Sequence, residues 1–412
     1  MLSRRGWGVL ASSVALVVAG RVLGLVELYI LAATSVALCA AAAAYVSLHG
    51  LDFRTDRVLH PPRVHAGGSS RVDLGIRNAG RRRIPVLEVR DPFDRGWRWA
   101  RFLVPPLAPG ATSRAAYRLP TEERGIFDIG PLEVSLSDPF GLARRRYSSA
   151  GVTQLTVYPR IDVVSPVPAA RGHDPQSAAH HPRALLGQGD DFYALRPYEV
   201  GDDLRRVHWA STARVDDLMI RQDEMPWQSR VTILVDVRRS VHTPESLELA
   251  VSAAASIHAA SLRERSLVRL VSTDGVDSGS GSGPSHSEPI LEHLATVEAS
   301  REDRLAGVID SLRRAGNGGV LAMVTTDRVP AADLQALARL RSRYSSILLV
   351  MFERSAYGAG APALTGRHQG PDGASGIPAG VLAALNGVVR VTAASPFAAA
   401  WEQARPAAEA RR

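Results

Sequence analysis

Lysine is absent from this chain of 412 residues, so arginine carries the positive charge behind a formal net charge of +8 at pH 7. A phosphate-binding P-loop requires a lysine on the phosphates. Pyridoxal phosphate and Schiff-base enzymes require a lysine amine. The sequence therefore excludes these classes of enzyme.

Cysteine is almost as scarce, because Cys39 is the single one in the chain. One cysteine excludes an intrachain disulfide and a cysteine-rich metal site. Because Cys39 lies in an apolar run, the sequence also argues against Cys–His catalysis of the usual kind.

The excess of arginine raises the question of nucleic acid as a partner. The arginines are spread along the chain beside acidic residues, and the sequence has no nucleic-acid recognition motif. We therefore expect no nucleic-acid partner. Attraction to the anionic inner face of a membrane is a more natural use of a mild excess.

Two apolar runs near the N-terminus predict two transmembrane helices within residues 1–50. Leu28–Leu48 has no charged residue and is long enough to cross a bilayer. Trp7–Gly20 is shorter, and it reaches the required length if Arg21 extends to the interface or the helix continues to Val26. A cleaved signal peptide is the alternative interpretation of the first run.

The placement of arginine predicts the orientation of this hairpin. Arg4 and Arg5 precede the first run, and Arg54, Arg57 and Arg63 follow the second. By the positive-inside rule, both ends of the hairpin and the globular part lie in the cytoplasm. The predicted location is thus the cell membrane, with cytoplasmic globular domains.

Residues 54–160 predict a β-sandwich domain, because short runs alternate between apolar and polar residues. Val72, Leu74 and Ile76 are one example, and turn pairs such as Pro109-Gly110 separate such runs. We expect Trp97 and Trp99 to lie in its core. Residues 161–186 have no periodicity and read as a linker. Its histidines have no carboxylate at ligand spacing, so we expect no metal site there.

Residues 231–405 predict an α/β domain with a doubly wound parallel sheet. The expected strands are Val231–Val235, Leu267–Val271, Gly319–Thr325, Ile347–Phe352 and Val388–Val391. The expected helices are Pro244–Arg265, Ile290–Val297, Arg301–Arg314, Ala331–Arg343, Pro378–Leu385 and Pro396–Ala404. Asp274–Pro289 and Ala356–Gly376 read as loops. Ligands of such sheets bind at the carboxyl ends of the strands, where Asp236, Ser240, Thr326 and Asp327 would lie.

A dense polar segment at residues 187–230 leads directly into the first strand of this sheet. Its candidate residues are Asp191, Arg196, Tyr198, Gly201, Asp202, Asp203, Arg205, His208, Trp209, Arg214 and Arg221. Such a cluster is either an internal ion network, with Trp209 packed beneath it, or a surface for docking a partner. Catalysis by His208 beside Asp202 is a third interpretation, for which no nucleophile can be named, so no catalytic residue is predicted.

The run Arg196-Pro-Tyr198-Glu-Val-Gly201-Asp202-Asp-Leu-Arg205-Arg-Val-His-Trp209 resembles the bacterial family called "domain of unknown function 58". The segment from Arg124-Gly125 through Gly130-Pro131 to Asp138-Pro139-Phe140-Gly141-Leu142 also resembles that family. The resemblance covers about residues 1–400. It implies a membrane anchor, a von Willebrand factor A-like C-terminal domain and work beside a MoxR-type AAA+ ATPase. It implies no chemistry.

The resemblance also raises the question of a metal site. Domains of the von Willebrand A type often bind Mg²⁺ through Asp-x-Ser-x-Ser, a threonine from a second loop and an aspartate from a third. Here Asp236 and Ser240 match, but Arg238 replaces the first serine, and Asp327 is the candidate third-loop ligand. A guanidinium repels a cation and could pair with Asp236 or Asp327 instead. We therefore expect a degenerate site without metal, with bound Mg²⁺ as the alternative.

These observations predict a non-enzymatic, membrane-anchored protein-interaction module. It would act with a MoxR-type ATPase in assembling or activating other complexes, and it would need no cofactor. Two alternatives remain. One is an exported, metal-dependent adhesion protein, and the other is a hydrolase that uses the region of Asp202 and His208.

Overall fold

The computed structural model describes residues 2–93, 96–149, 151–167, 191–198, 207–215, 217–224, 229–315, 318–356, 381 and 385–410. The chain divides into two compact units, Met1–Tyr158 and Pro159–Arg412. Each is described by itself below.

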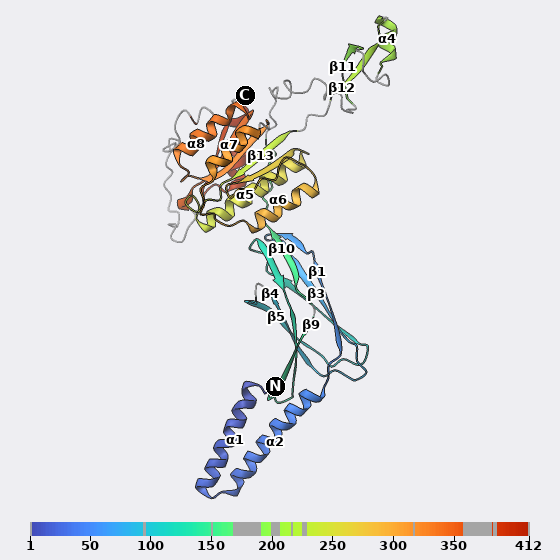
Figure 1. Ribbon diagram of the computed structural model, residues 1–412, viewed down its shortest axis with the longest axis vertical. Coiled ribbons are helices and arrows are strands. Elements are labelled where there is room, and N and C mark those ends of the chain that lie inside the picture. The colour runs from blue at the N-terminus through green and yellow to red at the C-terminus, as the bar shows by residue number, and fades with distance from the viewer. Residues whose placement is uncertain are drawn as a thin grey trace. The chain divides into compact units, whose positions relative to one another are not determined.

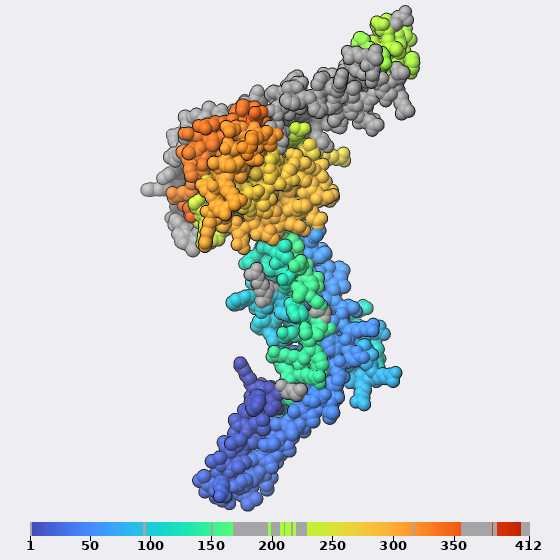
Figure 2. All heavy atoms as spheres, in the orientation of Figure 1, coloured from blue at the N-terminus to red at the C-terminus, as the bar shows by residue number. Residues whose placement is uncertain are grey.

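The first unit begins with two apolar helices, α1 (Arg4–Leu23) and α2 (Val26–Leu48), which pack side by side (Figures 1 and 2). The Ser3 hydroxyl caps α1 by accepting a hydrogen bond from Gly6 N at 3.1 Å. Gly24 ends α1 with a φ of 70°, a conformation that favours glycine. By length and composition, both helices could cross a membrane. The two predicted spans are therefore present as helices, with α1 extending beyond Gly20.

Two sheets follow the helices, and their strand pairs are antiparallel except for the parallel pair β2–β10. The three-stranded sheet has the order β1-β3-β6, and the seven-stranded sheet has the order β2-β10-β7-β4-β8-β9, with β5 paired to β4. Their strands are β1 (Phe53–His60), β2 (Arg63–His65), β3 (Ser70–Asn78), β4 (Leu87–Phe93), β5 (Arg98–Val104), β6 (Thr112–Leu119), β7 (Gly125–Ile129), β8 (Leu132–Ser137), β9 (Arg144–Ser149) and β10 (Thr153–Tyr158). Leu74 and Ile76 of β3 pack against Val89 of β4 and Val134 of β8. The sheets thus share a core, as the alternating pattern predicts.

The prediction that Trp97 and Trp99 lie in this core is wrong. The two side chains are 82% and 51% exposed. Trp99 lies in β5 and Trp97 directly before it, and β5 pairs only with β4 among the described strands. Trp99 instead lies 4.8 Å from the guanidinium carbon of Arg90, a distance typical of a cation–π contact. The alternation of apolar and polar residues predicts a strand, but it does not show which face of the strand packs against the rest of the domain.

A buried ion pair fastens the two sheets together. Arg57 of β1 donates to Asp91 of β4 at 2.8 Å, and Tyr117 of β6 donates to the other oxygen of Asp91 at 2.7 Å. The side chains of Arg57 and Asp91 are 2% and 0% exposed. Burial raises the pKa of Asp91, although its hydrogen bonds with Tyr117 and Arg57 act in the opposite direction.

The turn from Asp138 to Leu142, part of the family-like sequence, contacts the start of α1. Ser3 N donates to Leu142 O at 2.7 Å, and the Ser3 hydroxyl donates to Gly141 O at 2.6 Å. The Asp138 carboxylate holds the turn by accepting from Phe140 N at 2.9 Å. A Cβ at Gly6 would lie 2.2 Å from Leu142 O, so only glycine allows this approach. The turn therefore fixes the hairpin to the sandwich.

The second unit contains a five-stranded parallel sheet with the order β14-β13-β15-β16-β17 (Figure 1). The strands are β13 (Arg230–Val235), β14 (Leu267–Ser272), β15 (Val320–Thr326), β16 (Ser346–Phe352) and β17 (Gly387–Val391). The helices are α5 (Pro244–Arg263), α6 (Pro284–Thr296), α7 (Leu305–Ala315), α8 (Ala331–Ala338) and α10 (Phe397–Ala410), with a 3₁₀ turn at Arg339–Ser342. Residues of α5, α6 and α10 share one core with the sheet, and residues of α7 and α8 share another. The predicted parallel sheet, wound on both faces, is confirmed.

Several boundaries differ from the prediction: α7 begins at Leu305 rather than Arg301, and α8 ends at Ala338 rather than Arg343. The loop expected at Asp274–Pro289 ends early, because α6 begins at Pro284 and β-bridges join Asp277 and Gly281 to β14. The start of the expected linker is also packed: Val164 and Val167 are buried in the core of the second unit. Trp401 of α10 donates from Nε1 to Ser165 O at 2.9 Å. The composition of the segment does not predict that Val164 and Val167 are packed in this core. The helix expected at Pro378–Leu385 and most of the loop from Ala356 lie outside the described residues.

The polar segment forms a small antiparallel hairpin of β11 (Asp191–Pro197) and β12 (Met219–Glu224), with the helix α4 (Trp209–Val215) between the strands. His208 N donates to Met219 O at 2.8 Å, and Met219 N donates to the Thr212 hydroxyl at 3.0 Å. These bonds join α4 to β12.

Candidate functional site: an arginine-centred cluster at the sheet edge

Asp236 lies at the carboxyl end of β13 and is completely buried. Its backbone N–H donates to Val324 O of the neighbouring strand β15 at 3.0 Å. The sequence places it here because the apolar run Val231–Val235 forms a central strand, and the chain turns away directly after it. A buried carboxylate at this edge requires partners.

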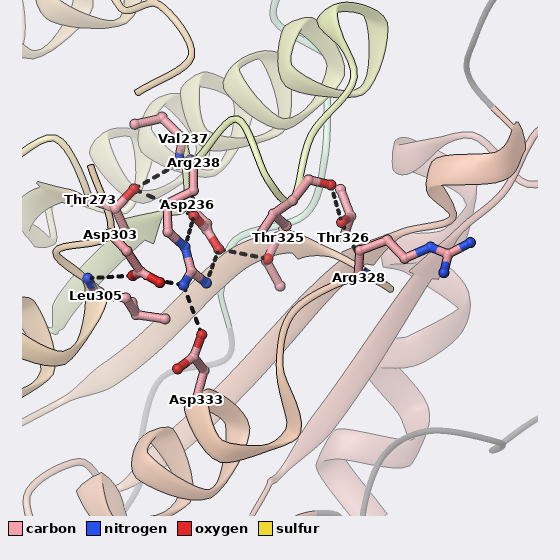
Figure 3. A network of polar contacts seen from close by, with 11 residues as sticks. Asp236, Val237, Arg238, Thr273, Asp303, Leu305, Thr325, Thr326, Arg328 and Asp333 are labelled. Carbon is pink, nitrogen blue, oxygen red and sulfur yellow. Dashed lines mark hydrogen bonds and ion pairs between the residues drawn. The ribbon is translucent and has the colours of Figure 1, made fainter. Parts of the chain in front are cut away.

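Arg238 supplies the principal partner of Asp236 (Figure 3). Its Nε donates to Asp236 Oδ1 at 2.9 Å, and its Nη2 donates to Asp236 Oδ2 at 2.8 Å. The side chain of Arg238 is only 2% exposed. This forked arrangement is the strong form of an arginine–carboxylate pair. The pairing of Arg238 with Asp236 is therefore present as predicted.

Two further carboxylates bind the remaining nitrogen of Arg238. Nη1 donates to Asp303 Oδ1 at 2.9 Å and to Asp333 Oδ2 at 2.8 Å. Asp303 precedes α7 and also accepts from Leu305 N at 3.4 Å, while Asp333 lies in the first turn of α8. Figure 3 shows the two side chains approaching the guanidinium from different elements. Arg238 thus joins three segments that are far apart in the sequence.

Two threonines complete the surroundings of Asp236. The Thr325 hydroxyl donates to Asp236 Oδ2 at 3.1 Å, and the Thr273 hydroxyl donates to Asp236 Oδ1 at 3.4 Å. Thr273 Oγ1 also accepts from Val237 N at 2.8 Å. Both threonines follow the pattern of polar residues at strand ends, and that signal could have identified them. Thr326, the threonine predicted at this edge, instead donates from its hydroxyl to Val241 O at 2.8 Å.

The surroundings of the cluster shift the pKa values of Arg238 and of the nearby His242 in opposite directions. Burial opposes the charge of Arg238, but the hydrogen bonds and charges of Asp236 and Asp333 outweigh it and raise the pKa of Arg238. Burial lowers the pKa of His242, and the charge of Asp236 offsets this only in part. Arg238 is therefore the cation of the cluster.

Asp327 and Ser240 do not occupy the places predicted for them. Asp327 is exposed, and its Oδ1 accepts from Arg354 N at 3.0 Å. The backbone carbonyl of Ser240 accepts from Arg354 Nη1 at 3.1 Å. The carboxylates that bind Arg238 besides Asp236 are Asp303, in the loop before α7, and Asp333, in the first turn of α8. Asp327 is the first residue after β15, and its backbone turns toward β16 rather than toward Arg238.

The carboxylates of this cluster do not fit a cation at the place of the guanidinium. Arg238 already lies between Asp236, Asp303 and Asp333 at hydrogen-bond distances. Within the described ranges, no three histidine, cysteine or acidic side chains are arranged so that they could hold a metal ion. An ion could reach these oxygens only if Arg238 left them.

The residues of the polar segment divide into described and undescribed ones. Register places Arg196 opposite Ile220 and Arg221 opposite Leu195, with Asp191 opposite Glu224 at the end of the same hairpin. Trp209 is 70% exposed, which contradicts the packing expected for it. His208 Nδ1 lies 2.9 Å from the Ser211 hydroxyl, Tyr198 N donates to Leu218 O, and Arg214 is exposed. Gly201, Asp202, Asp203 and Arg205 lie outside the described residues, so the interpretations that rest on them stay predictions.

Comparison with known proteins confirms the family resemblance. Residues 194–356 match the model of the family described as "Protein of unknown function DUF58". Uncharacterized proteins of Mycobacterium bovis and Mycobacterium tuberculosis are 26% identical to the chain over 184 residues, which is 42% of the chain and 58% of each relative. The match thus spans little more than half the length of these relatives.

Solved structures give only distant likenesses. The CARDB domain of a protein from Pyrococcus furiosus covers 26% of this chain and 93% of its own length, at 13% identity and a TM-score of 0.21. A β-glucosidase from Erythrobacter marinus covers 24% of this chain and 16% of its own, at 16% identity and a TM-score of 0.16. Scores this low carry no argument about function.

Proposed function

We propose that this protein is a membrane-anchored, non-enzymatic protein-interaction module with a von Willebrand A-like second unit. The observation that carries the proposal is the Arg238 cluster. Its four charged side chains bind one another, and the cluster links the loops after β13 and α6 to the first turn of α8. A site built in this way holds a surface in a defined shape, because its charged side chains satisfy one another.

The proposed anchor is the hairpin of α1 and α2, with the globular units on the cytoplasmic face. Support comes from two apolar helices of sufficient length and from arginines flanking both ends. The proposed partner is a MoxR-type AAA+ ATPase, which rests on the family resemblance alone. The module would bring this ATPase to the membrane, where complexes are assembled or activated.

The test is capture of partners by the tagged full chain from solubilised membranes of its own host, identified by mass spectrometry. We expect a MoxR-type ATPase among the captured proteins. An Asp333→Asn variant should recover less of it, because the loops lose one tie. Equal recovery by wild type and by an unrelated tagged hairpin protein would contradict the proposal.

A further inference from the structure

The carboxyl edge of the parallel sheet carries a set of exposed arginines around the buried cluster. Arg239 follows β13, Arg301 follows α6 and Arg328 follows β15, and all three side chains are exposed. We call these three residues the arginine rim. Within the described part of the chain, their guanidinium groups have no hydrogen-bonding or ionic partner. Arg328 extends away from the Asp236–Arg238 pair in Figure 3.

Hydrogen bonds hold the three loops of the rim together. Arg239 N donates to Ser300 O at 2.7 Å, and Ser300 N donates to Val237 O at 2.8 Å, so Arg239 and Arg301 come from adjoining loops. The Thr326 hydroxyl donates to Val241 O at 2.8 Å and accepts from Arg328 N at 3.3 Å. The rim is therefore preorganised, because its backbone is tied both directly and through Arg238 below it.

We propose that the arginine rim docks an acidic segment of a protein partner, which deepens the proposed function and rests on it. Guanidinium groups bind carboxylates through paired hydrogen bonds, and arginine is enriched at protein interfaces. Three unpaired guanidinium groups around one edge provide charge complementarity to aspartate and glutamate side chains. The carboxyl ends of the strands are also where open parallel sheets bind their ligands.

A polypeptide fits this rim better than a nucleic acid does. The side chain of Asp303 is 67% exposed, and Asp327 is exposed between the rim loops. These carboxylates repel a continuous row of phosphates. A polypeptide supplies backbone N–H donors for them together with carboxylates for the arginines.

The experiment measures binding of the full chain, in phosphatidylcholine nanodiscs, to an array of 12-residue peptides. Each peptide contains several aspartates or glutamates and is paired with a copy in which asparagine or glutamine replaces them. We expect wild type to prefer acidic peptides by about ten-fold, and we expect this preference to weaken with added salt. The double variant Arg239→Glu/Arg328→Glu should lose it.

Arg314→Glu is the matched control, because Arg314 is exposed near the end of α7, at the opposite edge of the sheet. It should retain the preference, and all variants should melt like wild type. Retention of the preference by the rim variant overturns the proposal, as does equal binding of acidic and amide peptides by wild type. Tighter rim-dependent binding of a single-stranded oligonucleotide than of every acidic peptide also overturns it.

The peptide array tests the arginine rim, and the capture from membranes tests the ATPase partner, so either experiment can fail without the other. Rim-dependent acidic binding without capture of an ATPase supports the rim and contradicts the partner. Capture of the ATPase that is unchanged in the rim variant supports the partner and overturns the rim as its docking surface.

Discussion

Arg238 takes the position that a hydroxyl ligand would have in a metal-binding version of this loop. A fixed guanidinium satisfies Asp236 without an ion from solution, at the cost of burying a charge that must be fully paired. Four hydrogen bonds from three of its nitrogens to three carboxylates supply that pairing. At this site the permanent charge of Arg238 satisfies Asp236.

Arg238→Ser should uncover the carboxylates and make the protein responsive to metal. We expect a loss of roughly 3–5 kcal/mol in stability in chelator, because Asp236 remains buried without its cation. Millimolar Mg²⁺ should restore part of the melting temperature. Calorimetry on wild type should give no Mg²⁺ site tighter than roughly 10 µM.

Second substitutions distinguish the carboxylates that matter in Arg238→Ser. Added Asp333→Asn should remove the response to Mg²⁺, whereas added Asp327→Asn should leave it, because Asp327 binds Arg354 N instead. If Asp327→Asn abolished the response to Mg²⁺, Asp327 would be a metal ligand, as the sequence predicts.

His258 makes stability depend on pH. Burial, with a smaller effect from His286, lowers its pKa to about 4, and its Nε2 lies 3.2 Å from the Ser287 hydroxyl. The unfolded chain takes up a proton near pH 6.5 and the folded chain does not until about 4. Stability is therefore lost as pH falls through this window, by up to about 3 kcal/mol. The melting temperature of His258→Gln should fall less steeply between pH 7 and 5, while His60→Gln, at an exposed site, should follow wild type.

At the scale of elements, the Arg57–Asp91–Tyr117 contacts join β1, β4 and β6 of the two sheets in the first unit. Asp91→Ala should destabilise the protein by about 3–5 kcal/mol, because it leaves the Arg57 guanidinium buried and unpaired by a carboxylate. Urea unfolding followed by tryptophan fluorescence measures this. Asp73→Ala should cost at most about 1 kcal/mol, since Asp73 pairs with Arg71 at the surface. Similar losses in both variants would refute a special role for the buried pair.

At the scale of the whole molecule, the proposed membrane hairpin would decide which compartment the two units occupy. A reporter fused after Arg412 should be active only if it is a cytoplasmic reporter, because arginines flank both ends of the hairpin. A fusion truncated at Gly24, between α1 and α2, should be active only with a periplasmic reporter. Periplasmic activity at Arg412 would contradict the proposed topology.

The amino-acid sequence is sufficient to predict the helical hairpin, the order of strands and helices in the parallel sheet, and a carboxylate partner for Arg238, either Asp236 or Asp327. These features depend on local patterns: uncharged length, alternation with a period of two, and two charges two residues apart. The family motif likewise lies in one stretch of chain. Local patterns are sufficient here because the residues that make each feature are neighbours in sequence.

Only the tertiary structure decided that Asp303 and Asp333, rather than Asp327, complete the cluster. The segments that carry them meet Arg238 because the parallel sheet brings the loop before α7 and the first turn of α8 to one edge. The same holds for the exposure of Trp99 and the burial of Val164, which depend on which surfaces other parts of the chain cover. Sequence patterns give the periodicity of an element and the positions of its charges. Which side chains become buried, and which distant segments meet, depends on how the elements pack.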